Sequence, residues 1–66
     1  MKIVVEYQGN TYDGAENKDY TAEEAKDLMY KDFEDIGKFA MELKEGGFII
    51  VGEDVIKSCV FKFIDT

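Results

Sequence analysis

The segment Thr21-Ala22-Glu23-Glu24 constrains the fold of this chain more than any other, because it holds a complete helix-start signal. In a capping box the Thr21 hydroxyl accepts a hydrogen bond from the amide of Glu24, and the Glu24 carboxylate accepts one from the amide of Thr21. Apolar residues then recur at steps of three and four, the period of an amphipathic helix: Ala25, Met29, Phe33, Ile36, Ala40 and Leu43, widened by Leu28 and Phe39. This pattern predicts a helix from Ala22 to about Lys44, closed by Gly46-Gly47 as a C-cap.

Gly37 lies inside the predicted helix. A glycine at an exposed helical position costs about 1 kcal/mol relative to alanine. Either the helix kinks at Gly37, or a backbone or an aromatic ring packs closely against it. The apolar stripe keeps its phase across this position, which favours close packing.

The sequence predicts strands both before and after the helix. Lys2 to Tyr7 alternates, and Gly9-Asn10 is typical of a hairpin turn, with Thr11 to Asp13 as a short return strand that would set Tyr7 opposite Tyr12. Phe48 to Val51 is predicted as a buried strand, followed by a turn and a longer strand from Val55 to Asp65. The order ββαββ predicts one α+β domain over residues 1–66, with one long helix packed on a small antiparallel sheet.

One helix covers only one face of such a sheet. Monomers seldom leave a large apolar patch open to water, and very small cores need support. We therefore predict a symmetric homodimer that covers the second face, or, as the alternative, a sheet curled tightly enough to bury both faces within one chain. The predicted dimer interface consists of Val4, Ile56, Val60 and Ile64.

Four residue types are missing from the chain, and their absence restricts its chemistry: it contains no His, Arg, Trp or Pro. Without His it lacks the usual general base and the commonest metal ligand, and Ser58, its only Ser, has nothing to activate it. Without Arg it lacks a bidentate phosphate clamp. Paired carboxylates remain able to do acid–base work, but we expect a protein that is not an enzyme.

The N-terminal stretch MKIVVEYQGN does not have the pattern of a secretion signal, and Cys59 is the only cysteine. Both features are typical of a protein of a reducing compartment, so we expect a cytoplasmic location. Cys59 stands in an apolar string and is interpreted as a small buried hydrophobic residue.

The segment that starts at Asp13 partly matches a calcium-binding EF-hand loop. Asp13, Asn17, Asp19 and Glu24 fall on ligand positions, but Ala15 occupies another ligand position and cannot coordinate a cation. Lys18 stands where that loop needs glycine, and a strand pattern rather than a helix precedes it. We expect no metal and no cofactor.

The net charge of −7 is unevenly distributed. Residues 13–35 hold nine acids and three Lys, a net charge of −6. This charge disfavours direct binding to nucleic acid and to anionic membranes. The acids either keep the protein soluble, partly paired as Asp27–Lys31 and Glu34–Lys38, or imitate the phosphates of DNA toward a basic protein, with tyrosines as contact residues. The candidate partner-binding residues are Asp13, Glu16, Asp19, Tyr20, Glu23, Glu24, Asp27, Tyr30, Asp32, Glu34 and Asp35.

The acidic block of residues 13–35, on a small chain without Arg or His, resembles the small acidic proteins that bacteriophages make during host takeover. Several of those proteins inhibit a host DNA-binding protein by mimicking DNA. The resemblance rests on charge and size over about a third of the chain. It implies a homodimer in the host cytoplasm that occupies the DNA-binding groove of a basic host protein, such as a nucleoid-associated protein.

Two other functions are compatible with the sequence. A structural or oligomerisation module would act through the apolar sheet face or the last strand, by adding a strand to a partner's sheet, while its acids only solvate it. An inhibitor of an enzyme with a basic nucleic-acid channel, such as a nuclease or a polymerase, would use the same charge mimicry on a different target.

Overall fold

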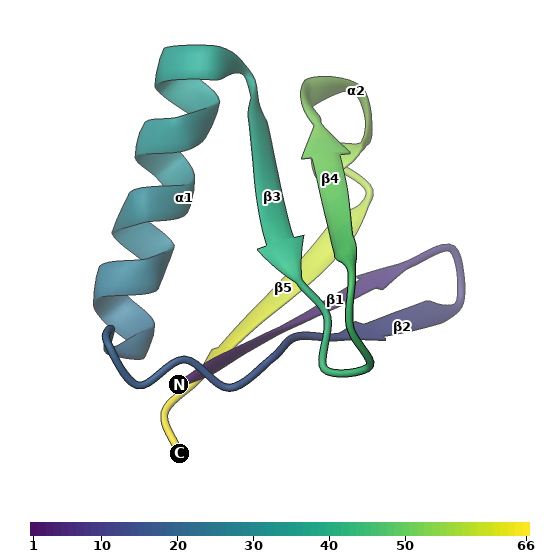
Figure 1. The fold of residues 1–66 in the computed structure, drawn as a ribbon. Helices are drawn as coiled ribbons and strands as arrows, with labels where there is room; N and C mark the ends of the chain where they lie inside the picture. Colours follow the sequence, from purple (N-terminus) through teal and green to yellow (C-terminus); the bar gives the residue numbers. More distant parts are fainter.

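The computed structural model describes residues 1–66 and confirms a small α+β fold with antiparallel sheets. Figure 1 shows the long helix standing beside a hairpin, with the remaining strands running obliquely behind that hairpin. The elements, in chain order, are β1 (Lys2–Tyr7), β2 (Asn10–Asp13), α1 (Ala22–Ile36), β3 (Lys38–Glu42), β4 (Phe48–Gly52), α2 (Glu53–Ile56) and β5 (Cys59–Ile64).

Three strands form the first sheet, in the order β2-β1-β5. Val5, at the centre of β1, lies opposite Tyr12 on β2 and Phe61 on β5. The predicted pairing of Tyr7 with Tyr12 is wrong, since Tyr7 lies opposite Asn10. The turn is one residue earlier than predicted: Gln8 and Gly9 both have positive φ, 49° and 79°, as a tight hairpin turn requires.

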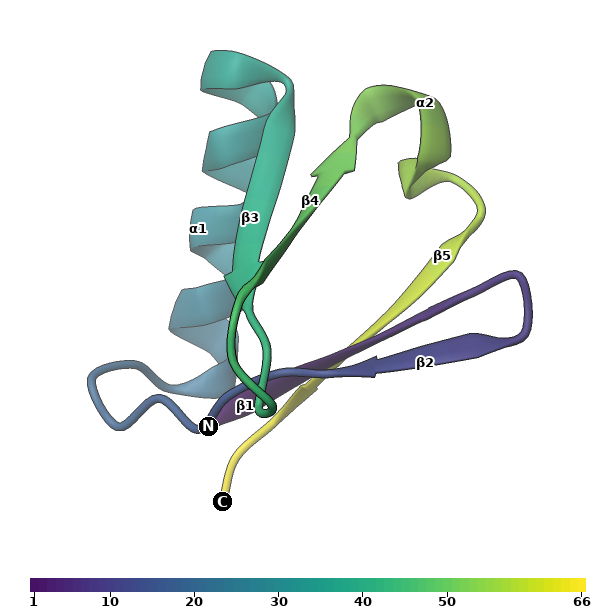
Figure 2. The ribbon, with the colours of Figure 1, turned by 45° about the vertical axis from the view of Figure 1, so that its right-hand side comes forward.

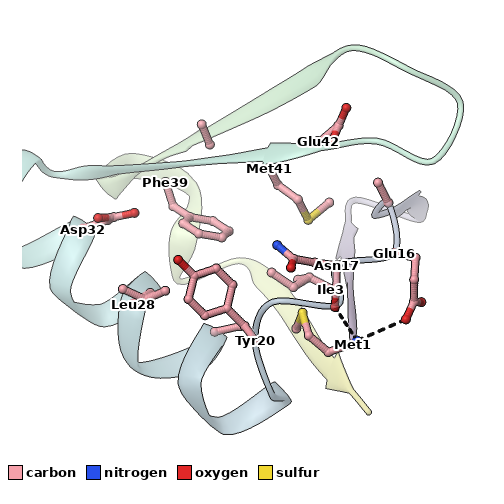
Figure 3. Close-up of a pocket in the computed structure, with 13 residues that line it drawn as sticks. Met1, Ile3, Glu16, Asn17, Tyr20, Leu28, Asp32, Phe39, Met41 and Glu42 are labelled. Atoms are coloured by element: carbon pink, nitrogen blue, oxygen red, sulfur yellow. Dashed lines mark hydrogen bonds and ion pairs between the residues drawn. The ribbon is translucent and has the colours of Figure 1, made fainter. Parts of the chain in front are cut away.

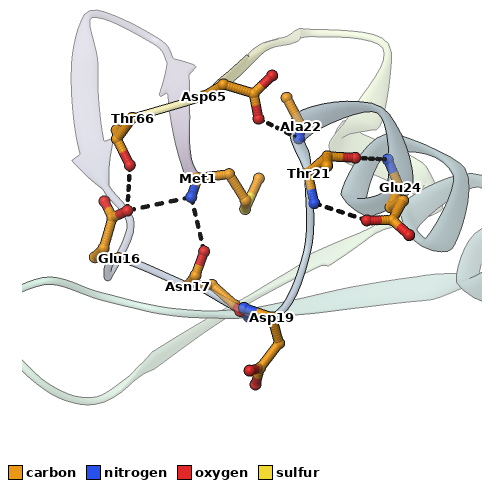
Figure 4. Close-up of polar contacts among 9 residues, drawn as sticks. All are labelled: Met1, Glu16, Asn17, Asp19, Thr21, Ala22, Glu24, Asp65 and Thr66. Atoms are coloured by element: carbon orange, nitrogen blue, oxygen red, sulfur yellow. Dashed lines mark hydrogen bonds and ion pairs between the residues drawn. The ribbon is translucent and has the colours of Figure 1, made fainter.

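Helix α1 begins as predicted and ends earlier than predicted. In the capping box the amide of Glu24 donates to Thr21 Oγ1 at 3.2 Å, and the amide of Thr21 donates to Glu24 Oε1 at 2.9 Å (Figure 4). The helix stops at Gly37, whose φ of 70° and ψ of 17° are left-handed and whose amide donates to the Phe33 carbonyl. The prediction of a helix to Lys44 is therefore wrong, and Gly37 neither kinks the helix nor sits in a close packing contact within it. It terminates the helix, because glycine adopts the left-handed conformation without strain.

Strands β3 and β4 form a second, two-stranded sheet from residues that were expected in part to continue the helix. Phe39 and Met41 point into the core, while Ala40 between them is exposed. This alternation is that of a strand with one buried face. Gly46 and Gly47 belong to the turn between β3 and β4, so the predicted C-cap at these residues is also wrong.

The predicted strand from Val55 to Asp65 is divided in two. Val55 and Ile56 lie in the short helix α2, and only Cys59 to Ile64 form a strand. Cys59, Phe61 and Phe63 face the core, as the alternation of the sequence predicts. Ile56 does not share a strand face with the other predicted interface residues, because it is on α2.

The core lies where α1 and the β3-β4 hairpin cover the inner face of the three-stranded sheet. Its buried members are Val5, Met29, Phe39 and Met41. A chain of aromatic rings joins the layers: the ring centroids of Phe33 and Phe39, and of Phe39 and Phe61, are each 6.5 Å apart. Figure 2 shows that the two sheets diverge from each other. Only 8 of the 66 residues are buried, so the structure depends on a very small core.

The outer face of the three-stranded sheet carries Val4, Val60 and Ile64, as predicted. This face is also charged, because Lys62 Nζ lies 3.3 Å from Glu6 Oε1 and Lys2 Nζ lies 3.7 Å from Asp13 Oδ1. Neither helix of the fold has the length and apolar character that a membrane span requires.

Candidate functional site

Five acids lie together on the solvent side of α1. The helical period turns Ala25 and Met29 into the core, so residues on the opposite side of the helix face outward. All five outward carboxylates are exposed: Glu23, Glu24, Asp27, Glu34 and Asp35. We call these residues, with the exposed Tyr30 among them, the acidic face.

The carboxylates of α1 are spaced along the helix almost as closely as the phosphates of one DNA strand. The helix carries six acids in 15 residues when Asp32 is included. At about 1.5 Å per residue it is about 22 Å long, which gives one carboxylate per about 3.7 Å. One strand of duplex DNA carries one phosphate per about 3.4 Å of axis. Lys26 and Lys31 lower the net charge of the helix to −4.

The acidic face is hardly neutralised within the chain. Its one ion pair joins Lys26 Nζ and Asp27 Oδ1 at 3.9 Å. The predicted pairs Asp27–Lys31 and Glu34–Lys38 do not form. Lys38 lies beyond the left-handed residue Gly37, on β3, so it is no longer one helical turn from Glu34. Glu23, Glu34 and Asp35 therefore have no partner within the chain, whereas Glu24 also accepts a hydrogen bond in the capping box.

The acids before the helix have local partners instead. Glu16 Oε1 lies 3.2 Å from the N-terminal ammonium of Met1 and accepts a hydrogen bond from the Thr66 hydroxyl (Figure 4). The Thr66 hydroxyl and then the ammonium hold the pKa of the exposed Glu16 carboxyl below its ordinary value. Asp13 pairs with Lys2 on the sheet, and its carbonyl accepts from the amide of Lys44.

The remaining candidate partner-binding residues lie in the loop before α1 or beside a pocket. Asp19 is exposed in the loop, where its amide donates to Asn17 Oδ1 at 2.8 Å. The structure thus gathers the helix acids on one face, while Asp13 and Glu16 lie elsewhere and are engaged in contacts of their own. Tyr20 and Asp32 border a pocket that the sequence did not reveal.

This pocket lies between α1, β3, Met1 and the loop before the helix (Figure 3). Its volume is about 240 Å³, and nine of its thirteen lining residues are hydrophobic. Leu28, Phe39 and Met41 supply apolar lining, while Glu16, Asp32 and Glu42 bring carboxylates to its border. The sequence pattern does not indicate this pocket, because the helical period extends over residues 38–42, which form the strand at its opposite wall.

Comparison with protein-family models, with curated proteins and with solved structures finds no match to this chain. No related protein therefore assigns a role to the acidic face or to the pocket.

Two features bear on what this arrangement can do chemically. Partial burial of Cys59 raises the pKa of its thiol, which opposes formation of a nucleophilic thiolate. The exposed carboxylates of α1 lie beside an apolar hollow with acids at its border, so a cationic surface with a protruding apolar side chain fits both features.

Proposed function

We propose that this chain is a non-enzymatic, acidic binding protein that occupies the nucleic-acid-binding surface of a basic protein and blocks it. The observation that carries the proposal is the acidic face of α1, whose carboxylates are exposed and closely spaced and form only one ion pair within the chain. A protein surface built to bind phosphates displaces counterions when it meets such a row of charge, as it does on DNA.

The pocket beside the acidic face supports the same proposal. Charge alone gives weak and unselective binding, whereas a buried apolar or aromatic anchor supplies most of the affinity at an interface. Leu28 and Tyr20 lie at the pocket and are 38% and 44% exposed, so they are available to such an anchor. Tyr30, 61% exposed, adds an aromatic contact within the acidic face. Proteins of this kind include the inhibitors that bacteriophages direct at nucleoid-associated proteins, and a host cytoplasm is the corresponding location.

The test begins with the immobilised protein and a nuclease-treated bacterial lysate. Bound proteins are eluted with a salt gradient and identified by mass spectrometry. We expect a basic nucleic-acid-binding protein that elutes as the salt concentration rises. The captured protein, once purified, is then bound to a labelled DNA duplex, and the acidic protein is expected to displace that duplex.

Two variants of equal net charge make the test specific. Glu23→Gln/Asp27→Asn/Glu34→Gln removes three charges from the acidic face, and Glu45→Gln/Glu53→Gln/Asp54→Asn removes three exposed charges elsewhere. Both change the net charge from −7 to −4. We expect only the first variant to lose the partner. Equal loss in both variants, or a partner whose retention ignores salt, would refute charge mimicry by α1.

A second candidate function is a module that binds through the apolar outer face of the three-stranded sheet. The exposure of Val60, 52%, and of Ile64, 38%, favours it. This function predicts salt-tolerant binding that Val60→Lys or Ile64→Lys abolishes, and that the acidic-face variant leaves intact.

A further inference from the structure

The most exposed apolar side chains of the fold that share one strand lie on β4. Phe48 is 70% exposed and Ile50 is 67% exposed, although each alternates with a residue that faces the core. Ala40, opposite Ile50 on β3, is exposed on the same face of the hairpin. This outer hairpin face is separate from the acidic face and from the outer face of the three-stranded sheet.

The backbone of β4 also has an unpaired edge. The amide of Leu43 donates to the Gly47 carbonyl at 2.9 Å, so Leu43 and Gly47 form a hydrogen-bonded pair of the hairpin. In the observed register the next hydrogen-bonded pairs are Met41 with Ile49 and Phe39 with Val51. Because antiparallel bonding alternates, the backbone groups of Phe48, Ile50 and Gly52 point away from β3. No strand of the chain pairs with β4 on that side (Figures 1 and 2). An open edge of this kind is a template for another strand.

We propose that a second copy of this chain pairs with β4, antiparallel, about a two-fold axis at Ile50. Centred there, the pairing engages all five residues of the strand. Each Ile50 exchanges both backbone hydrogen bonds with Ile50 of the second copy, and the amide of Gly52 donates to the carbonyl of Phe48 of the second copy. The two hairpins become one sheet in the order β3-β4-β4-β3.

The side chains on this face complement one another in that register. Phe48 lies opposite Gly52 of the second copy, and nothing stands within 4 Å of the space that a side chain would occupy at Gly52. The ring of Phe48 thus fits the open space beside Gly52 of the second copy. The two-fold axis repeats this contact, because both copies use the same patch of surface. Glu42 neighbours Phe48 and Lys38 neighbours Gly52 across the hairpin, so each row of the joined sheet carries opposite charges at its two ends.

The area involved indicates a reversible dimer. A phenylalanine side chain covers about 150–250 Å² in an interface, so two Phe48 rings that are 70% exposed would remove about 200–350 Å² from water. With Ile50 and the paired backbone, the interface stays at or below the roughly 1,200 Å² at which stable complexes begin. The dimer is therefore expected to form and dissociate with protein concentration.

Cross-linking tests the register directly. Residues that form a hydrogen-bonded antiparallel pair have Cα atoms about 5.5 Å apart, within the range that a disulfide spans. In a Cys59→Ala background, Ile50→Cys is compared with Ala40→Cys, whose copies would lie three strand spacings, about 14 Å, apart. Under oxidation by copper phenanthroline in air, we expect Ile50→Cys to form disulfide dimers at least about tenfold faster, because pairing raises the local concentration of its partner thiol. Equal rates would overturn the proposal.

Sedimentation equilibrium provides the second test. Ile50→Lys places two like charges opposite each other at the axis, and we expect dimerisation to weaken by on the order of 100-fold. Val60→Lys, on the outer face of the other sheet, is the matched control and should leave the equilibrium unchanged. Both positions are exposed, and circular dichroism verifies that both variants fold. A wild-type chain that stays monomeric at every concentration, or a dimer that Val60→Lys disrupts and Ile50→Lys does not, overturns the proposal. Neither result bears on partner binding by the acidic face.

Discussion

Replacement of Gly37 by alanine tests whether α1 ends at this residue. The substitution should destabilise the protein if the helix ends there and stabilise it if the helix continues. Gly37 ends α1 at φ 70° and ψ 17°. An L-residue in that left-handed conformation costs about 1–2 kcal/mol more than in the right-handed one. If residues 38–44 instead continued the helix, as the apolar period suggests, Gly37→Ala would stabilise the protein by about 1 kcal/mol.

The surroundings of Gly37 add a smaller effect. A Cβ atom at this position would lie 2.9 Å from Glu53 Oε1, which is the end of a flexible, exposed side chain. Glu53 is therefore expected to move aside at little cost, and the backbone conformation dominates the loss. Gly9→Ala is the matched control, since Gly9 has a similar φ of 79° and nothing stands within 4 Å of the added atom.

Thermal and urea unfolding followed by circular dichroism measure the outcome. For a domain of this size, 1 kcal/mol corresponds to about 4–8 °C in Tm. We expect Gly37→Ala to lower Tm by at least about 4 °C, and Gly9→Ala to lower it by a similar or slightly smaller amount. An unchanged or raised Tm for Gly37→Ala, with Gly9→Ala destabilised, would refute the assignment of Gly37 as the helix end.

Three further predictions concern stability. Gly14→Ala should destabilise the fold by about 2–3 kcal/mol, more than Gly37→Ala, because its Cβ would overlap the backbone carbonyl of Ile3, to which the Gly14 amide also donates; urea unfolding measures it. Met29→Ala, at a position 4% exposed in a core of few residues, should cost about 2–5 kcal/mol and lower the urea midpoint accordingly. Glu16→Gln tests pH dependence: folding lowers the pKa of Glu16, so its contribution is present above the ordinary pKa of 4.5 and is lost as the pH falls through the lower, folded-state pKa. The Tm difference between wild type and this variant should therefore be largest near neutral pH and disappear in acid.

The parts of the fold that rest on short-range signals could be predicted from the sequence. The capping box at Thr21 fixes the helix start through two local hydrogen bonds, and the alternation of β1 fixes its buried face. The α+β class follows from these elements. The helical period that buries Met29 also leaves five acids of α1 exposed, whereas Asp32 is half-buried at the pocket.

The helix end could not be predicted from periodicity, because two periods overlap there. Phe39, Ala40 and Leu43 fit a helical stripe that began at Ala25, yet Phe39, Met41 and Leu43 also alternate as a strand. The helix ends because Gly37 adopts a left-handed conformation. That conformation is favoured by the packing of β3 against β4 and the core, which is a long-range effect. The pocket depends on that strand, so it was missed with it.

Salt should act in opposite directions on the stability of this protein and on the binding proposed for it. Glu23 and Asp27 are one helical turn apart, about 6 Å along the axis. This spacing is within the Debye length of about 10 Å at 0.1 M salt, so their repulsion is only partly screened at low ionic strength. Together with the net charge of −7, this repulsion costs stability in the free protein.

We therefore expect Tm to rise between 10 and 200 mM NaCl, a range over which the Debye length falls from about 30 Å to below 10 Å. The acidic-face variant Glu23→Gln/Asp27→Asn/Glu34→Gln should show a smaller rise than Glu45→Gln/Glu53→Gln/Asp54→Asn, although the two carry the same net charge. A Tm that falls with salt would mean that attractive pairs such as Lys62–Glu6 outweigh the repulsion within α1. In that case self-repulsion within α1 would not dominate the electrostatic contribution to the stability of the free protein.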